Sequence, residues 1–359
     1  MSANQERRER DHLAAGEGTV LSSLSEWGGA RPLLIGNDIE NPGNADSLRV
    51  AAEMFDWECG FLYDSHHSGA QPAAGLAGSR IISTAELAAC GMPIIALENA
   101  SGAEDLFRFR PPEGRFVVVA GNERKGISHD ILRLADRVVQ IPIASAHINT
   151  VNVAAAAAIA LYYLSRGGGG RAVPRGGHER GRPEVLLAAP TDAIEVGSVV
   201  RSAACFGWTR LFVDDRHDAW FDTDRVTRSL GRGAARRGRN PIRVLPARGC
   251  GLFEEVCVVS TRGDGEPLRR AHLALGPGQL VVIPDESGGA IEDREFARLG
   301  RHVRRVRLET EHAEPRPFRL VASIALAEIA RQVGGWRRPS EGKRGQRNPL
   351  SVFTEGGES

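Results

Sequence analysis

The sequence predicts two similar α/β domains, each built on a mainly parallel sheet. The chain has 359 residues, which suggests two domains at roughly 150 residues each. Short runs of Val, Ile and Leu alternate with helical patterns, and these runs are apolar on both faces, as in parallel strands covered by helices. Segments of the first half also recur in the same order in the second half, which indicates an internal duplication.

The recurring segments define the domain organisation. They pair 45–64 with 197–215, 94–106 with 256–268, 115–126 with 279–289, and 156–164 with 322–330. A Gly- and Arg-rich stretch between the halves has the composition of a linker. We therefore expect an N-terminal arm, a first domain, a linker, a second domain and a basic tail, over residues 1–30, 31–165, 166–183, 184–333 and 334–359.

The elements of the first half follow from apolar runs bounded by turn residues. Strands are predicted at 31–36, 59–64, 92–97, 115–121 and 136–142, and helices at 45–55, 128–135 and 152–165. Asn41-Pro-Gly-Asn44 is a turn and helix-start signal, and Thr150 or Asn152 can cap the alanine-rich helix that follows.

Composition and charge exclude several classes. No apolar run reaches the ~20 residues of a membrane-spanning helix, and the charged N-terminus lacks the apolar core of a secretory signal, so we expect a cytoplasmic protein. The five cysteines form no CxxC pair, which argues against a zinc site and a disulfide framework and favours buried thiols. We expect no metal.

Three loops of the first half follow predicted strands and carry polar residues or glycines. They are Asn41 to Arg49, Gly121 to Ser128, and Ile141 to Asn152. Each alone reads as an ordinary turn or helix cap. Open α/β sheets, however, bind their ligands at the carboxyl ends of strands, and glycines there let a ligand approach the backbone.

Together and in this order, the three loops resemble the SpoU/TrmH-type methyltransferases of the SPOUT superfamily. That family has an Asn-Pro-x-Asn…Arg motif, a Gly-x-Glu-x-x-Gly motif, and an Ile-Pro-hydrophobic…Ser-Leu-Asn motif before an Ala-rich helix. The resemblance is strong over 31–165 and weaker over 184–333. It implies a trefoil-knotted fold, an obligate dimer, bound S-adenosylmethionine, and methylation of a ribose 2′-hydroxyl in tRNA or rRNA.

The resemblance also assigns roles to residues. Its catalytic candidates are Asn44, Arg49, Glu123, Asn152 and, from the second half, Arg201. Its cofactor-binding candidates are Leu97, Ala120, Gly121, Asn122, Gly126, Ile141, Ile143, Val151 and Asn152. The first motif is irregular here, because Asn44 stands five residues before Arg49 instead of six.

The second half departs from the family pattern in a complementary way. Glu195, Gly197 and Arg201 keep the regular spacing of the first motif, whereas Pro315-Arg-Pro317 replaces Ser-Leu-Asn. We therefore expect an intrachain pseudo-dimer with one working site in the first half, which Arg201 faces, and a chain that is monomeric. The alternative is that Arg201 is only a structural relic at the domain interface.

A cluster of arginines points to the substrate. Residues 225–248 hold eight arginines and no acid, which favours a phosphate-binding patch, although a solvated face is the simpler alternative. The candidate RNA-binding residues are Arg228, Arg232, Arg236, Arg237 and Arg239. RNA is thus the expected partner. Two alternative functions stay open: methylation of a small-molecule acceptor, and RNA binding by a non-catalytic paralogue.

Overall fold

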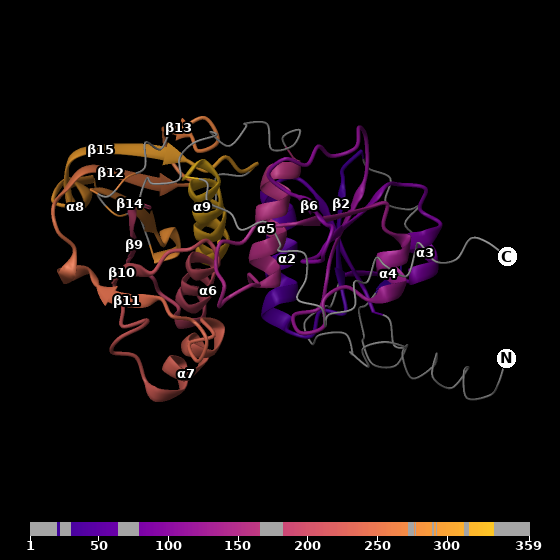
Figure 1. Ribbon diagram of the computed structural model, residues 1–359, viewed down its shortest axis with the longest axis horizontal. Helices are drawn as coiled ribbons and strands as arrows, with labels where there is room; N and C mark the ends of the chain where they lie inside the picture. The colour runs from indigo at the N-terminus through magenta and orange to yellow at the C-terminus, as the bar shows by residue number, and fades with distance from the viewer. Residues whose placement is uncertain are drawn as a thin grey trace.

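The computed structural model contains two parallel-sheet domains with helices between them (Figure 1), which confirms the predicted α/β class. It describes residues 20–21, 30–63, 79–165, 182–271, 276, 278–288, 291, 293–311 and 316–333. Most of the predicted arm, linker and tail, and residue Pro315, lie outside the described residues.

The first sheet has the strand order β1-β4-β3-β2-β7-β5-β8-β6, and all its pairs are parallel. Its strands are β1 (Val20–Leu21), β2 (Leu33–Asn37), β3 (Glu58–Leu62), β4 (Arg80–Ile82), β5 (Ile94–Leu97), β6 (Glu104–Asp105), β7 (Val117–Ala120) and β8 (Arg137–Gln140). Its helices are α2 (Pro42–Met54), α3 (Thr84–Ala88), α4 (His129–Leu134) and α5 (Val153–Leu164).

The second sheet has the order β11-β10-β9-β14-β12-β15-β13, again with parallel pairs. Its strands are β9 (Glu184–Ala188), β10 (Arg210–Asp214), β11 (Arg243–Pro246), β12 (Phe253–Ser260), β13 (Glu266–Pro267), β14 (Gln279–Pro284) and β15 (Gly300–Arg307). Its helices are α6 (Ala193–Cys205), α7 (Arg225–Ala234), α8 (Asp293–Ala297) and α9 (Phe318–Val333), with short 3₁₀ turns η2 (Ala247–Gly249) and η3 (Glu286–Gly288).

The two sheets repeat one topology. If β2 is matched with β9, the strands β4-β3-β2-β7-β5-β8-β6 follow the same order as β11-β10-β9-β14-β12-β15-β13. The helix α2 follows β2, the helix α6 follows β9, and both helices have 13 residues. The recurrence of segments in the sequence therefore has a counterpart in the order of the strands.

The predicted elements of the first domain are present with shifted ends. The largest shift is at α2, which begins at Pro42 instead of residue 45 because the Asn41 side chain accepts from the backbone N–H of Asn44 and Pro42 suits the first turn. The short strands β4 and β6 and the one-turn helix α3 were not predicted, because so few residues carry little periodicity.

Four helices form the layer between the two sheets: α2 and α5 from the first domain, α6 and α9 from the second (Figure 1). Both α5 and α9 are buried on nearly all sides, which explains why α5 is apolar or small all round and why the buried charged residues of α9 form ion pairs. The largest apolar cluster runs through these helices and joins the two domains into one core. Within the described part of the chain, no helix combines the length and apolarity that crossing a bilayer requires.

Matched hydrogen bonds cross between the domains. The carbonyl of Met54, the last residue of α2, accepts from the N–H of Glu311 at 2.9 Å, four residues after β15. The carbonyl of Cys205, the last residue of α6, accepts from the N–H of Ala144 at 2.9 Å, four residues after β8. Each domain thus offers the same groups to the other, which is the pattern of a two-fold, self-complementary interface.

The buried thiols give a first testable prediction. All five cysteines are free, and burial raises the pKa of Cys205 and of Cys257 to about 12. Only the thiolate reacts readily, so these two thiols are expected to resist a thiol reagent at pH 8 in the folded protein. Ellman's reagent, added to native and urea-unfolded protein, measures this. Equal rates for all five thiols in both states would contradict it.

Candidate functional site

The three predicted loops meet at one edge of the first sheet. The strands β2, β7, β5 and β8 lie side by side and parallel, so the loops that follow them share the carboxyl edge. The loop after β5 is tied to the loop after β8, because the Asn99 amide donates to the carbonyl of Asn149 at 3.0 Å.

A chain of hydrogen bonds connects one polar residue from each loop. The Glu123 carboxylate accepts from the Asn44 amide nitrogen at 2.8 Å and from the backbone N–H groups of Glu40 and Asn41. The Asn44 amide oxygen accepts from the Asn152 side chain at 3.0 Å. Asn152 in turn caps α5 by accepting from the N–H groups of Ala154 and Ala155. Asn44, Glu123 and Asn152, three of the polar candidates of the first domain, thus lie in one hydrogen-bonded chain.

The glycines of the second loop permit a close approach of backbone segments. A Cβ on Gly121 would lie 2.4 Å from the backbone of Gly126 and Ile127, and Gly126 has φ +74°. Only glycine fits both places without displacing the chain. The Glu98 carboxylate fixes this turn by accepting from the N–H of Ile127 at 2.9 Å. The sequence reading missed Glu98, although an acid directly after a buried strand is a usable signal.

The buried side chain of Asn122 fixes the same loop through hydrogen bonds to the backbone. Its amide nitrogen donates to the carbonyl of Asp38 at 2.6 Å, and its amide oxygen accepts from the N–H groups of Arg124 and Lys125. The candidate apolar residues come from neighbouring segments: Leu97 ends β5, Ala120 ends β7, and the others stand in the loop after β8. That last group comprises Ile141, which is buried, and Ile143 and Val151, which are half-buried.

Arg201 reaches the third loop from the second domain. Its Nε donates to the Thr150 carbonyl at 2.6 Å, and its Nη2 donates to Thr150 Oγ1 at 2.8 Å and to the Val151 carbonyl at 3.0 Å. Among the described residues, no carboxylate pairs with Arg201. Burial, with the nearby charge of Arg236, lowers the pKa of Arg201 to about 10, which leaves it charged at neutral pH.

Arg49 lies elsewhere. It is half-exposed and pairs with Asp46 at 3.1 Å, one turn earlier in α2, and its charge acts on Cys59 near the amino end of β3. Arg49 comes five residues after Asn44, which turns it about 140° around the helix from that side chain. Val50 holds the ninth position of α2, where α6 has Arg201. The one-residue irregularity of the first motif therefore takes the arginine away from this edge.

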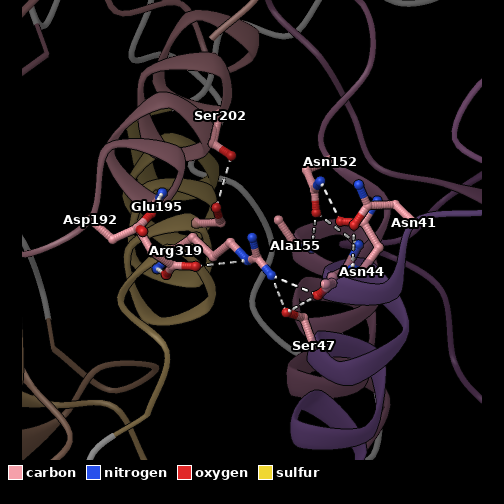
Figure 2. Close-up of polar contacts among 12 residues, drawn as sticks. Asn41, Asn44, Ser47, Asn152, Ala155, Asp192, Glu195, Ser202 and Arg319 are labelled. Carbon is pink, nitrogen blue, oxygen red and sulfur yellow. Dashed lines mark hydrogen bonds and ion pairs between the residues drawn. The ribbon is translucent and has the colours of Figure 1, made fainter. Parts of the chain in front are cut away.

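A second arginine crosses the interface, and the sequence reading missed it. Figure 2 shows Arg319 between Glu195 and the start of α2. Its guanidinium pairs with Glu195 at 3.1 Å, donates to the Gly43 carbonyl at 2.9 Å and contacts Ser47 Oγ. Burial raises the pKa of Glu195, and the ion pair with Arg319 opposes that rise. Glu195 occupies the position in α6 that Asn44 occupies in α2.

At the matching edge of the second sheet, the polar residues make different hydrogen bonds. The Glu286 carboxylate turns back onto the end of β12, where it accepts from Ser260 Oγ and from the hydroxyl and N–H of Thr261. Pro317, which has no N–H and no polar side chain, precedes α9 at the place where Asn152 precedes α5. The polar chain of the first domain has no counterpart among these residues.

The candidate RNA-binding arginines lie on α7 and just after it. Arg228 and Arg232 belong to the helix, and Arg236, Arg237 and Arg239 follow its end. Arg236 is close enough to lower the pKa of Arg201. The arginine cluster therefore extends toward the loop that Arg201 holds.

Comparisons with known proteins agree with the motif reading. The model of the SpoU rRNA Methylase family matches residues 78–162, a range that includes β4 and ends in the last turn of α5. A search of curated proteins finds no match.

Several solved structures are similar to part of the chain. An AdoMet-bound rRNA methyltransferase from Sinorhizobium meliloti is 19% identical, with 40% of this chain and 59% of that chain covered and a TM-score of 0.33. The SpoU methyltransferase AviRb from Streptomyces viridochromogenes is 21% identical, with 40% and 62% covered and a TM-score of 0.31. A TrmH/SpoU tRNA-modifying enzyme from A. aeolicus is 19% identical, with 38% and 75% covered and a TM-score of 0.32. The chain spans about three fifths of the length of the first two.

The family match contains the second and third loops and the strands that present them. The first loop, which lies outside the match, is joined to them through Asn44. Residues 78–162 therefore match the SpoU rRNA Methylase family, the same family that the motifs of the second and third loops resemble.

Proposed function

We propose that the chain is an S-adenosylmethionine-dependent methyltransferase that methylates a ribose 2′-hydroxyl of tRNA or rRNA. The observation that carries the proposal is the joining of all three family motifs at one sheet edge through Glu123, Asn44 and Asn152. The solved structures named above include RNA methyltransferases and one with bound AdoMet, which agrees with this activity.

The residues at this edge suit the cofactor. Gly121 and Gly126 let the loop after β7 fold tightly onto itself, because a Cβ at either place would collide with backbone or with Glu98, and this fixes the loop that would hold the cofactor. The apolar side chains of Leu97, Ile141 and Val151 would contact a flat aromatic base, and the backbone around Ile141 and Ile143 would bind its edge. S-adenosylmethionine supplies an activated methyl group on a sulfonium.

The protein's own task in this reaction is alignment. A transfer from a sulfonium needs the acceptor oxygen, the methyl carbon and the sulfur in line, and small misplacements cost large factors in rate. Arg201 fixes the Thr150–Val151 loop from the other domain, so it acts as a positioning residue. Because it remains charged and has no described carboxylate partner, its charge also favours negative charge that develops on a hydroxyl oxygen nearby.

We also propose that the two domains form an intrachain pseudo-dimer and that the chain is a monomer in the cytoplasm. Only the first domain would then contain a working cofactor and catalytic site. The shared strand order and the matched bonds at Met54 and Cys205 support a duplication. Glu286 and Pro317 support a single site, because they replace the open loop and the polar cap of the first domain. The trefoil knot stays a prediction.

Cofactor stoichiometry tests the single site. Isothermal titration calorimetry of the full chain with S-adenosylmethionine is expected to give one site per chain. Gly121→Ala is expected to abolish binding, because its Cβ would displace the Gly126–Ile127 backbone. Gly233→Ala, where a Cβ meets nothing within 4 Å, is the matched control and should bind as the parent does. Two sites per chain would contradict the proposal.

Methyl transfer itself is tested with a labelled donor. The full chain is incubated with methyl-labelled S-adenosylmethionine and total tRNA or rRNA, and the RNA is digested to nucleosides. A labelled 2′-O-methylnucleoside is the expected product. Label on a base would contradict ribose as the target. Transfer only to free nucleosides would favour the small-molecule alternative, and cofactor binding with no transfer to either would favour a non-catalytic RNA-binding protein.

A further inference from the structure

The second domain contains a cavity that the proposed reaction does not use. It has a volume of about 180 Å³ and lies between α7, β11 and the loop that precedes α7. Two aromatic residues, three arginines and one valine line it: Trp220, Phe221, Arg228, Arg232, Arg237 and Val244.

The charged side chains that line this cavity are all arginines. None of its three arginines forms an ion pair within the part of the chain that the structure describes, and no carboxylate lines the cavity. Arg228 is held by donating to the carbonyls of Phe221 and Thr223 at 3.0 and 2.7 Å, and Arg237 contacts the Ile242 carbonyl. These guanidinium groups are thus anchored through neutral carbonyls, which leaves their charge available to an anion.

The aromatic side of the cavity is built by a fixed loop. The Asp215 carboxylate accepts from the backbone N–H of Trp220 at 2.9 Å and from that of Phe221 at 2.6 Å. Asp224 then caps α7 by accepting from the N–H groups of Val226 and Thr227. The loop geometry is therefore set by the protein's own hydrogen bonds, so the cavity exists before any ligand arrives.

The size of the cavity limits the enclosed part of its occupant. A cavity of roughly 150 Å³ accepts one benzene ring, so about 180 Å³ encloses one flat ring system, and the rest of a larger ligand would lie at the mouth. Aromatic walls favour a planar group, and arginines favour phosphate. A nucleotide unit combines the two, whereas an acidic peptide offers the anion without the ring.

The cavity also lies on the helix that leads to the candidate site. The helix α7 packs closely on α6, where a Cβ on Gly197 would lie 2.2 Å from the Gly231 carbonyl. Beyond the end of α7, Arg236 comes close to Arg201, which holds the Thr150–Val151 loop.

We propose that this cavity binds one nucleotide of a single-stranded RNA segment, with the base against Trp220 and Phe221 and the phosphates on Arg228, Arg232 and Arg237. This inference rests on the proposed function for its substrate class, but it names a binding site apart from the cofactor edge. It assigns the second domain a role in substrate capture.

Binding of a short fluorescein-labelled single-stranded RNA to the full chain, without cofactor, tests the proposal. Phe221→Leu keeps apolar volume but removes the aromatic face, and Arg232→Gln removes one exposed charge. Each is expected to weaken binding roughly tenfold. Arg232→Gln should also lower the salt dependence of log K by about 0.7. Arg301→Gln, an exposed arginine on β15, is the matched control and should bind as the parent does.

Two outcomes would overturn the proposal. One is that Phe221→Leu and Arg232→Gln bind the RNA as tightly as Arg301→Gln does. The other is that an abasic oligomer of the same length, or an acidic peptide, binds as tightly as the RNA. Cofactor calorimetry and methyl transfer, measured on the same variants, separate this from the proposed activity. A chain that binds RNA through the cavity but transfers no methyl group refutes only the activity.

Discussion

Replacing Arg201 with alanine is expected to lower methyl transfer by about a hundredfold or more. The change removes three hydrogen bonds that fix Thr150 and Val151, at a place where a misplacement of about 1 Å is enough to cost that factor. Arg201→Lys keeps the charge but not the planar fork, so it should recover only part of the activity. Steady-state kinetics of both variants, with the cofactor Kd from calorimetry, measure the effect.

Arg49→Ala is the matched comparison. Arg49 is half-exposed and pairs only with Asp46 among the described acidic residues, so its loss is expected to leave most of the activity. Thermal unfolding of both variants checks that the fold is kept. If Arg49→Ala abolished transfer while Arg201→Ala kept it, Arg201 would be a structural relic of the interface, and the shared site would be refuted.

Removal of the Glu328 carboxylate is expected to give the largest loss of stability, about 3–5 kcal/mol for Glu328→Ala. Glu328 is fully buried between the domains, where it accepts from Tyr163 Oη of the first domain at 2.6 Å and from Arg331 Nε and Nη2 at 2.8 and 2.6 Å. Burial beside Glu328 raises the pKa of Tyr163, so its hydroxyl stays protonated and donates. Without Glu328, Arg331 becomes a buried charge with its carboxylate partner gone.

Urea unfolding measures this loss as the change in the free energy of unfolding. Glu295→Ala breaks the ion pair with Arg216 at the surface and is the control, with an expected cost below about 1 kcal/mol. Glu328→Met combined with Arg331→Met removes both charges and should recover part of the stability. A cost for Glu328→Ala no greater than that of Glu295→Ala would show that this pair does not stabilise the interface.

The sequence was informative where local chemistry decides the structure. Asn41 and Asn152 are helix-start signals in the sequence and both cap helices in the structure, and Gly121 stands where a side chain would collide with backbone. Parallel strands that are apolar on both faces predicted the sheet, and the order of strands then brings their loops to one edge. These features depend on neighbours in the chain or on the sheet as a whole.

The contacts that the sequence did not predict join distant positions. Arg319 contacts the Gly43 carbonyl across 276 positions, and no local pattern marks that pair. The cavity beside α7 was likewise missed, because the arginines were visible as a cluster but Trp220 and Phe221 join them only through the loop that Asp215 folds. The one-residue irregularity of the first motif is present in the sequence, but it turns Arg49 away only because Asn44 and Arg49 belong to the same helix, which begins at Pro42.

The matched bonds at Met54 and Cys205 have a consequence for how this protein can vary. In a dimer of identical subunits every substitution at the two-fold interface occurs twice, so a change that helps one site must be tolerated at the other. A single chain with both faces escapes that restriction. It keeps neutral amides at Asn44 and Asn152 on one side, and on the other a charged pair, Glu195 and Arg319, that would repel or crowd if it were mirrored. If the two domains are a duplicated pair, as proposed, each can change its interface residues independently of the other.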